Sequence, residues 1–173
     1  MSLRFALLGA LADRPRTGYE LLKHFEQSLA YAWPASHSQI YPELARLRDD
    51  GLIEQTGAGA RNSKTYAVTD AGLAEIRHWL RDTEPDRRVR SDAALRTFFL
   101  WILEPEEARD ELERERSYWR ERLAELEAIE ARPRGPGRKE QAFGIALEGG
   151  IRGMRTRLAR LDWAGRELGT NPE

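Results

Sequence analysis

The chain has 173 residues, of which 40% are hydrophobic and 33% charged, an ordinary composition for one domain or two small ones. It has no cysteine, which excludes disulfides, thiolate catalysis and cysteine-based zinc sites, and its longest apolar run, residues 98–103, is far too short to span a membrane. The net charge is −1, and ten basic and ten acidic residues in 1–82 balance as closely as the eighteen and nineteen in 83–173, so a nucleic-acid site would have to be a local patch.

The first twelve residues allow two interpretations. One arginine followed by Phe-Ala-Leu-Leu-Gly-Ala-Leu-Ala resembles a short signal peptide with an Ala-x-Ala cleavage site, but the same residues suit a buried helix. We favour the helix, because Arg4 is the only early positive charge and the apolar segment runs straight into a helix cap. Together with the absence of cysteine, this favours a cytoplasmic protein.

Two capping boxes mark the starts of two further helices. Thr17 and Glu20 form the first box, and Ser36 and Gln39 form the second. Gly51 stands where a residue in left-handed geometry would end the second helix. Apolar stripes follow both boxes: Tyr19, Leu22, Phe25 and Leu29 in one helix, and Ile40, Leu44 and Leu47 in the other. Two capped helices a short turn apart are typical of a helix-turn-helix.

A hairpin and another helix follow. Residues 52–55 and 64–69 alternate apolar with polar side chains, and the polar, glycine-containing residues 57–63 lie between them. Thr69 caps a helix whose apolar face is Leu73, Ile76 and Leu80. This order predicts a mainly α-helical fold, in which residues 1–82 form a winged helix-turn-helix domain with a two-stranded wing.

The second half is predicted to be a helical domain over residues 91–170, after a polar linker. Helical segments are expected over 92–103, from Pro105 to about 131, and from about 139 onward. Their long apolar stripes favour packing against a second copy in a two-fold dimer, and an intramolecular three-helix bundle is the alternative. The residues assigned to the dimer interface are Leu112, Trp119, Leu123, Leu126, Phe143, Leu147, Ile151, Met154 and Leu158.

The helix that begins after Ser36 is the best candidate for reading DNA. Its N-terminal N–H groups and dipole favour phosphate, Gln39 can bond the edge of adenine, and the hairpin tip can meet phosphates or a minor groove. Alternatively, Ser36 and Gln39 only cap the helix, and the charges of the tip are merely solvated. The candidate DNA-binding residues are Tyr19, Ser36, Ser38, Gln39, Tyr41, Pro42, Arg46, Arg61, Asn62 and Lys64.

Several segments of the first half resemble the PadR family of bacterial transcriptional regulators. They are Leu-Leu-Gly-Ala-Leu from residue 7, Thr-Gly-Tyr-Glu-Leu from 17, Ser-Gln-Ile-Tyr-Pro-Glu-Leu-Ala-Arg-Leu from 38, Gly-Leu-Ile from 51 and Tyr-Ala-Val-Thr-Asp-Ala-Gly from 66. The second half is similar, by its layout, to the longer subfamily with a helical C-terminal dimerisation domain. The resemblance implies a homodimer that represses transcription at a pseudo-palindromic operator and is released by a signal.

The resemblance also places Tyr19, Ser38, Gln39, Tyr41 and Pro42 at or next to the DNA face, and Arg61 and Lys64 on the wing. Asp49 and Asp50 stand where many relatives carry glutamate. They should not harm DNA binding, because this end of the helix points away from the groove.

Other functions find little support in the residues. The three histidines show no metal-ligand spacing, no catalytic triad is indicated, and we expect no enzyme activity, cofactor or metal. An aromatic effector could bind among Trp33, Trp101, Trp119 and Trp163, although these rings could equally be core. A winged-helix module that docks protein rather than DNA is the alternative function, because the domain is electrically neutral.

Overall fold

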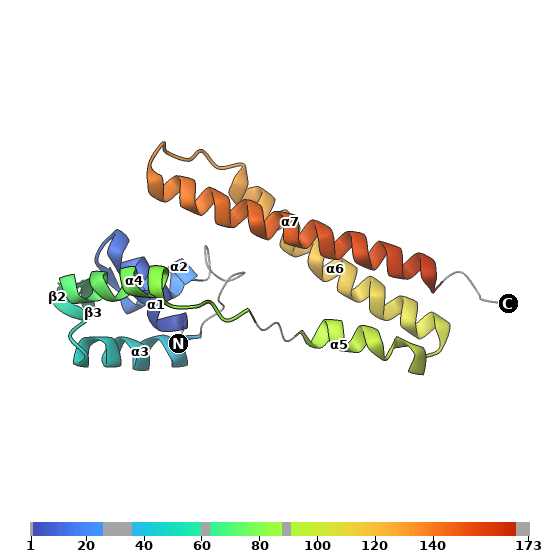
Figure 1. The fold of residues 1–173 in the computed structure, drawn as a ribbon, viewed down its shortest axis with the longest axis horizontal. Helices are drawn as coiled ribbons and strands as arrows, with labels where there is room; N and C mark the ends of the chain where they lie inside the picture. Colours follow the sequence, from blue (N-terminus) through green and yellow to red (C-terminus); the bar gives the residue numbers. More distant parts are fainter. Residues whose placement is uncertain (1, 26–35, 60–62, 88–90, 169–173) are drawn as a thin grey trace. The chain divides into compact units, whose positions relative to one another are not determined.

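A computed structural model describes residues 2–25, 36–59, 63–87 and 91–168 of the chain (Figure 1). The chain divides into two compact units, Met1–Arg87 and Arg88–Glu173. The N-terminal unit contains α1 (Ser2–Asp13), β1 (Arg16–Thr17), α2 (Gly18–His24), α3 (His37–Asp49), β2 (Ile53–Gly59), β3 (Ser63–Val68) and α4 (Asp70–Asp82). The C-terminal unit contains α5 (Asp92–Phe98), the 3₁₀ helix η3 (Leu100–Ile102), α6 (Pro105–Glu130) and α7 (Arg138–Glu167). The predicted fold class, a mainly helical chain with a winged helix and a helical second half, is confirmed.

The core of the N-terminal unit forms where α1, α2 and α3 meet. Leu7, Leu8 and Leu11 of α1 are fully buried there, which supports the interpretation of the first residues as a buried helix. On α2 the buried side chain is Leu21, and Phe25, the C-cap residue one helical turn later, is buried as well. The predicted apolar stripe was wrong at Tyr19, which is 58% exposed, and its last member lies outside the described residues.

The wing is a three-stranded antiparallel sheet in the order β1-β3-β2. The sequence predicted only the β2–β3 hairpin, because β1 has two residues and a two-residue strand has no alternation to detect. Thr17 of β1 pairs with Thr65 of β3, which places the start of α2 beside the wing. Gly51 has φ +72°, as predicted for the residue that ends α3, since a side chain is disfavoured there.

In the C-terminal unit α6 and α7 pack against each other as an antiparallel hairpin (Figure 1). The helix α6 begins with Pro105, after an N-cap glutamate. Two ion pairs from α6 to α7 fix the register of the two helices: Arg116 with Asp162 (2.9 Å) and Glu127 with Arg155 (2.8 Å). Among the described residues no helix is long and apolar enough to cross a membrane.

The apolar stripes of α6 and α7 pack largely within one chain, and the dimer interface predicted on them stays a prediction. The interface prediction assigned nine residues to contacts with a second copy. Five of them, Leu112, Leu126, Leu147, Ile151 and Met154, are buried in the single chain, and the other four, Trp119, Leu123, Phe143 and Leu158, are half-buried. Their burial needs no partner, because the two stripes face each other. The five buried residues therefore pack as the intramolecular alternative expects, and contacts of the four half-buried residues with a second copy stay a prediction.

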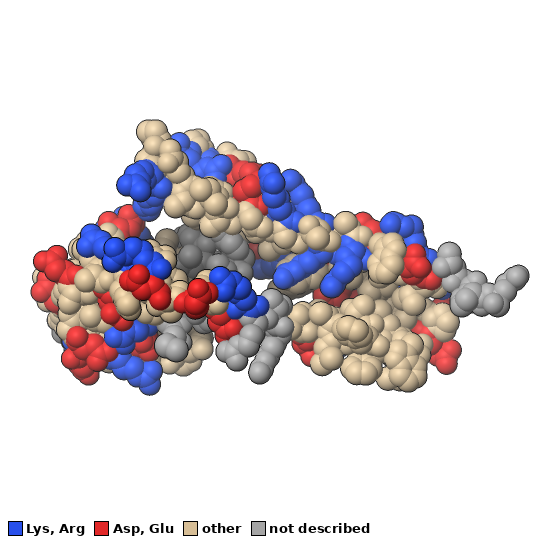
Figure 2. Space-filling model, in the orientation of Figure 1, with Lys and Arg blue, Asp and Glu red and all other residues tan. Residues whose placement is uncertain are grey.

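A different apolar surface is left uncovered in this unit. It consists of Leu95, Phe98, Phe99, Trp101, Ile102 and Leu103, and is called the α5–η3 patch below. Phe98 and Trp101 are both 77% exposed, and Figure 2 shows a broad area without charges over these elements. Monomeric proteins rarely expose a contiguous apolar patch of this kind without a binding function.

Candidate nucleic-acid interface

The first turns of α3 are held against α2 by a contact that only glycine allows. A Cβ atom at Gly18 would lie 2.7 Å from Cε1 of the Tyr41 ring, so that ring rests directly on the backbone at the start of α2. The ring of His37 lies on α3 one turn earlier, with its centroid 4.3 Å from that of Tyr41. Tyr41 remains 39% exposed. Two of the sequence motifs thus meet in space, and the contact fixes where Tyr41 points.

The exposed side of α3 carries most of the residues predicted to contact DNA. Its buried side consists of Ile40, Leu44 and Leu47, as the sequence predicted. Ser36, Ser38, Gln39, Tyr41, Pro42 and Arg46 are all exposed. The N-terminal end of a helix presents free N–H groups and the positive end of the helix dipole, which favours an anion.

Gln39 is engaged in the helix cap. Its Oε1 accepts hydrogen bonds from the backbone N–H of Ser36 (3.0 Å) and from the Ser36 hydroxyl (3.1 Å). Bidentate recognition of adenine needs the amide oxygen and nitrogen together. The cap and base reading therefore exclude each other in this conformation. The capping alternative describes Gln39 in the free chain, and its reading of a base stays a prediction.

The capping box predicted at Thr17 and Glu20 also forms. The Glu20 carboxylate accepts hydrogen bonds from the backbone N–H (2.7 Å) and the hydroxyl (2.9 Å) of Thr17. These bonds hold the pKa of Glu20 below its usual range, with the backbone N–H as the largest cause. The start of α2, next to Tyr19, is therefore fixed by a charged cap.

Two lysines of the N-terminal unit, one on α2 and one on β3, have no carboxylate partner in the described part of the chain. The Lys23 ammonium lies 5.0 Å from the ring centroid of Tyr19 on α2, and Lys64 is exposed on β3. Sequence reasoning missed Lys23, although its position four residues after an exposed tyrosine is a usable signal. Arg61 and Asn62, predicted at the tip of the wing, lie outside the described residues.

The arginines of this unit are largely neutralised by acids. Arg46 pairs with Glu43 at 3.1 Å, while Arg48 pairs with Asp49 at 2.7 Å. Buried Arg16 donates to the carbonyl of Ala10 and the carboxylate of Asp13, so its role is structural. The last acid of α3, Asp50, is held by Arg4 of α1 at 2.7 Å. The two aspartates at the end of α3 thus each have a cationic partner.

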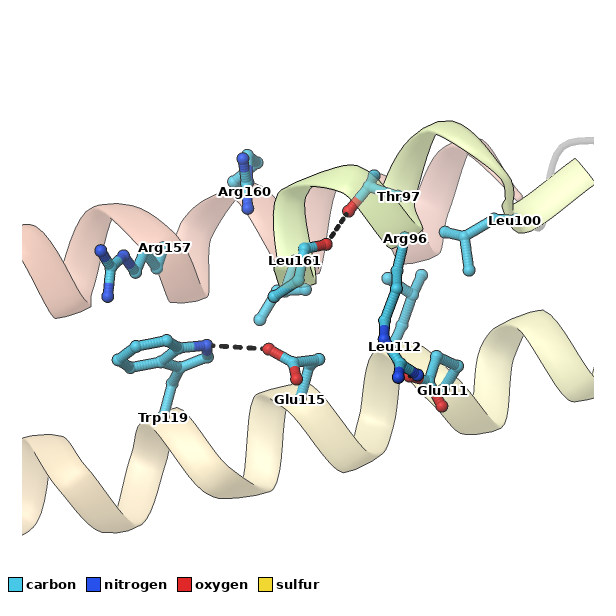
Figure 3. Close-up of a pocket in the computed structure, with 11 residues that line it drawn as sticks. Arg96, Thr97, Leu100, Glu111, Leu112, Glu115, Trp119, Arg157, Arg160 and Leu161 are labelled. Atoms are coloured by element: carbon cyan, nitrogen blue, oxygen red, sulfur yellow. Dashed lines mark hydrogen bonds and ion pairs between the residues drawn. The ribbon is translucent and has the colours of Figure 1, made fainter. Parts of the chain in front are cut away.

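Of the four tryptophans proposed for an effector site, Trp119 lines a cleft. Trp119 lies in a cleft between α5, α6 and α7 (Figure 3), whereas Trp101 and Trp163 are 77% and 53% exposed. Trp33 lies outside the described residues. The four rings therefore do not gather into one described site.

Comparison with known proteins covers both units. A family model described as the transcriptional regulator PadR-like family matches residues 7–78, and one described as virulence activator alpha C-term matches residues 89–169. The negative transcriptional regulator PadR of Bacillus subtilis is 37% identical over 112 residues, which are 62% of this chain and 62% of that protein's own length. The aligned region thus spans less than two thirds of that relative.

Solved structures extend the likeness to nearly the whole chain. The crystal structure of Bacillus subtilis PadR in complex with operator DNA superposes with a TM-score of 0.85 at 26% identity, covering 97% of this chain and 99% of that one. The same regulator in complex with p-coumaric acid gives a TM-score of 0.82 at 26% identity, covering 98% and 100%.

Proposed function

We propose that this chain, which belongs to the PadR-like family of transcriptional regulators, binds double-stranded DNA through its N-terminal unit. In this way it would control transcription, without catalysing a reaction. The observation that carries the proposal is the exposed first half of α3. It presents Ser38, Tyr41 and Pro42 on a surface that is positioned by the glycine contact at residue 18. Solved PadR in complex with operator DNA has the same fold.

The proposed contacts with DNA are of two kinds: contacts to phosphates, which position the protein on the duplex, and contacts to base edges, which read its sequence. The free N–H groups at the start of α3, together with Lys23 and Lys64, would meet phosphates and fix the orientation on the duplex. Ser38 and Tyr41 would face the base edges of a major groove. Since the unit has balanced charge, binding depends on these few local cations rather than on long-range attraction.

The chain would act as a homodimer that pairs through the α5–η3 patch. Most of the earlier candidates on α6 and α7 are buried within one chain, whereas the patch leaves six large apolar side chains exposed. A two-fold dimer places two winged helices on two half-sites, which suits a pseudo-palindromic operator. One such unit alone would bind weakly, so pairing raises the affinity through effective concentration.

We further propose repression with release by a small ligand. The Bacillus subtilis relative is named a negative regulator, and its solved structures contain operator DNA in one case and p-coumaric acid in the other. A repressor of this kind needs a ligand that binds the DNA-competent and incompetent states with different affinity.

The salt dependence of binding to DNA from upstream of the chain's own gene tests the proposal. The logarithm of the affinity should fall linearly with the logarithm of the salt concentration, and Lys64→Ala should make the slope shallower by about one. Lys139→Ala removes the same charge from exposed α7 and should leave the slope unchanged. Absent or salt-insensitive binding would favour a module that docks protein instead.

A further inference from the structure

The turn that joins α6 to α7 carries a concentrated positive charge. Residues 131–139 read Ala-Arg-Pro-Arg-Gly-Pro-Gly-Arg-Lys, with four basic side chains and no acid, in a chain whose net charge is −1. All of these residues are exposed, and Figure 2 shows basic side chains at the end of the hairpin where α6 runs into α7. Three arginines of this turn, Arg132, Arg134 and Arg138, are called the basic tip below.

The arginines of the basic tip have no acid that neutralises them. Among residues 91–168 none of the three forms an ion pair, although Glu130 and Glu140 flank the turn. Arg152, further along α7, shows the contrast, because it pairs with Glu148 at 2.6 Å. The fourth cation of the turn, Lys139, has an interaction of its own and is therefore not counted with the basic tip.

The backbone of the turn limits where these arginines can point. Pro133 comes two residues after the C-cap of α6, and Pro136 comes directly before Gly137, the N-cap of α7. The guanidinium of Arg134 lies against the backbone of α7, since a Cβ atom at Gly144 would be 3.0 Å from its Nη1. Proline fixes the backbone angle φ, and a segment that is already ordered loses less entropy when it binds a partner.

A cluster of unpaired arginines is suited to phosphate. The planar guanidinium donates two parallel hydrogen bonds to phosphate oxygens, and it is more weakly hydrated than the ammonium of lysine. Three of them within residues 132–138 can meet successive phosphates of a polymer, which a single small anion does not offer. The polyanion that a DNA-bound regulator meets at high effective concentration is DNA itself.

We propose that the basic tip binds the phosphate backbone of double-stranded DNA, as a second contact on the C-terminal unit that is separate from the winged helix. Contacts to phosphates carry no sequence information, so the basic tip would raise the affinity for every duplex alike. The choice of DNA as the polyanion rests on the proposed function, whereas the affinity of the basic tip for phosphate does not.

The salt dependence of binding to a random-sequence duplex, measured with the full chain by fluorescence anisotropy, tests the basic tip. Each phosphate contact contributes about 0.9 to the slope of log affinity against log salt, so Arg132→Gln/Arg134→Gln/Arg138→Gln should make the slope shallower by about two to three. The affinity at low salt should fall by about tenfold or more. No binding of the wild type at low salt, or an unchanged slope in the variant, overturns the proposal.

A matched control separates the basic tip from net charge. Arg114→Gln/Arg120→Gln/Arg152→Gln removes the same charge from exposed positions of α6 and α7, where each arginine is paired with a glutamate. This variant should keep the wild-type slope. An equal change of slope in both triple variants overturns the proposal, because it would show a response to charge alone.

Lys64→Ala separates the basic tip from the winged helix. Lys64 lies in the other unit, so its loss of slope should add to that of the triple variant of the basic tip. A loss of slope in the basic-tip variant without one in Lys64→Ala refutes the winged-helix contact and supports the basic tip. A loss in Lys64→Ala alone overturns the basic tip and leaves the proposed function standing.

Competition with other polyanions tests the choice of DNA. Unlabelled DNA should displace the labelled duplex from the wild type more effectively than duplex RNA or poly-L-glutamate at the same concentration of charge. If RNA or poly-L-glutamate displaces the duplex better, and the basic-tip variant loses that advantage, the proposal is overturned in favour of an RNA or an acidic protein.

Discussion

Replacing Gly18 with alanine tests whether the position of Tyr41 matters for DNA binding. A new Cβ would lie 2.7 Å from Cε1 and 2.9 Å from Cζ of the ring. Carbon atoms normally approach to about 3.5–4.0 Å, so the ring must move outward by about 1 Å. Overpacking costs about 1–3 kcal/mol, and we expect the lower end because Tyr41 lies at the surface and can turn away.

The loss of DNA affinity should exceed what the change in stability explains. A displaced ring no longer shares a surface with Ser38 and Pro42, and we expect affinity for the upstream DNA to fall about tenfold, or about 1.4 kcal/mol. Urea unfolding gives the stability, and fluorescence anisotropy with labelled DNA at fixed salt gives the affinity. Protein that remains folded in the binding buffer rules out unfolding as the cause of the loss.

Gly9→Ala is the matched control. Gly9 is also helical, but a Cβ there would meet nothing within 4 Å. Alanine should stabilise the chain by about 0.5–1 kcal/mol and leave the affinity unchanged. If Gly18→Ala behaves like Gly9→Ala in both assays, the reasoning from the Tyr41 contact is refuted.

Three further changes address the dimer, the cap and the pH dependence. Trp101→Glu should give monomers in sedimentation and Trp163→Glu should not, because only the first lies in the α5–η3 patch; a dimer that survives the first change moves the interface elsewhere. Gln39→Ala should cost about 0.5–1 kcal/mol of stability and weaken specific and random DNA alike, since its amide oxygen caps α3; a loss confined to one base pair would contradict this. The stability that wild type has over Glu20→Gln should be complete above pH 4.5 and shrink as the pH falls through the lowered pKa of the folded state; a difference that is constant over acidic pH in chemical unfolding would count against the charged cap.

Local signals in the sequence predicted the first unit well. Capping at Thr17 and Ser36 and the left-handed Gly51 depend on residues within a few positions of one another, so they can be found without knowing the fold. Tyr19 shows the limit of that approach. Spacing alone placed it on the buried stripe, although Leu21 fills that place in the core.

Residues of the candidate site that depend on distant segments could not be found in this way. The contact of Gly18 with Tyr41 joins positions 23 residues apart, and the pairing of β1 with β3 joins Thr17 to Thr65. The cleft at Trp119 forms only where α5, α6 and α7 come together, so no local stretch of sequence predicts it.

The sequence by itself determined where α2, α3, α4, α6 and α7 begin, that a winged helix comes first, and that the long helices of the second half bury one face, but it merged α5 and η3 into one helix over 92–103. Only the tertiary structure decided what covers those faces. Leu126 and Ile151 are buried within one chain, and the six apolar residues of the α5–η3 patch are left outside. The physical reason is that an apolar stripe predicts which face of a helix is buried but not which segment or chain covers it. The hydrophobic effect is non-directional and depends only on the area removed from water.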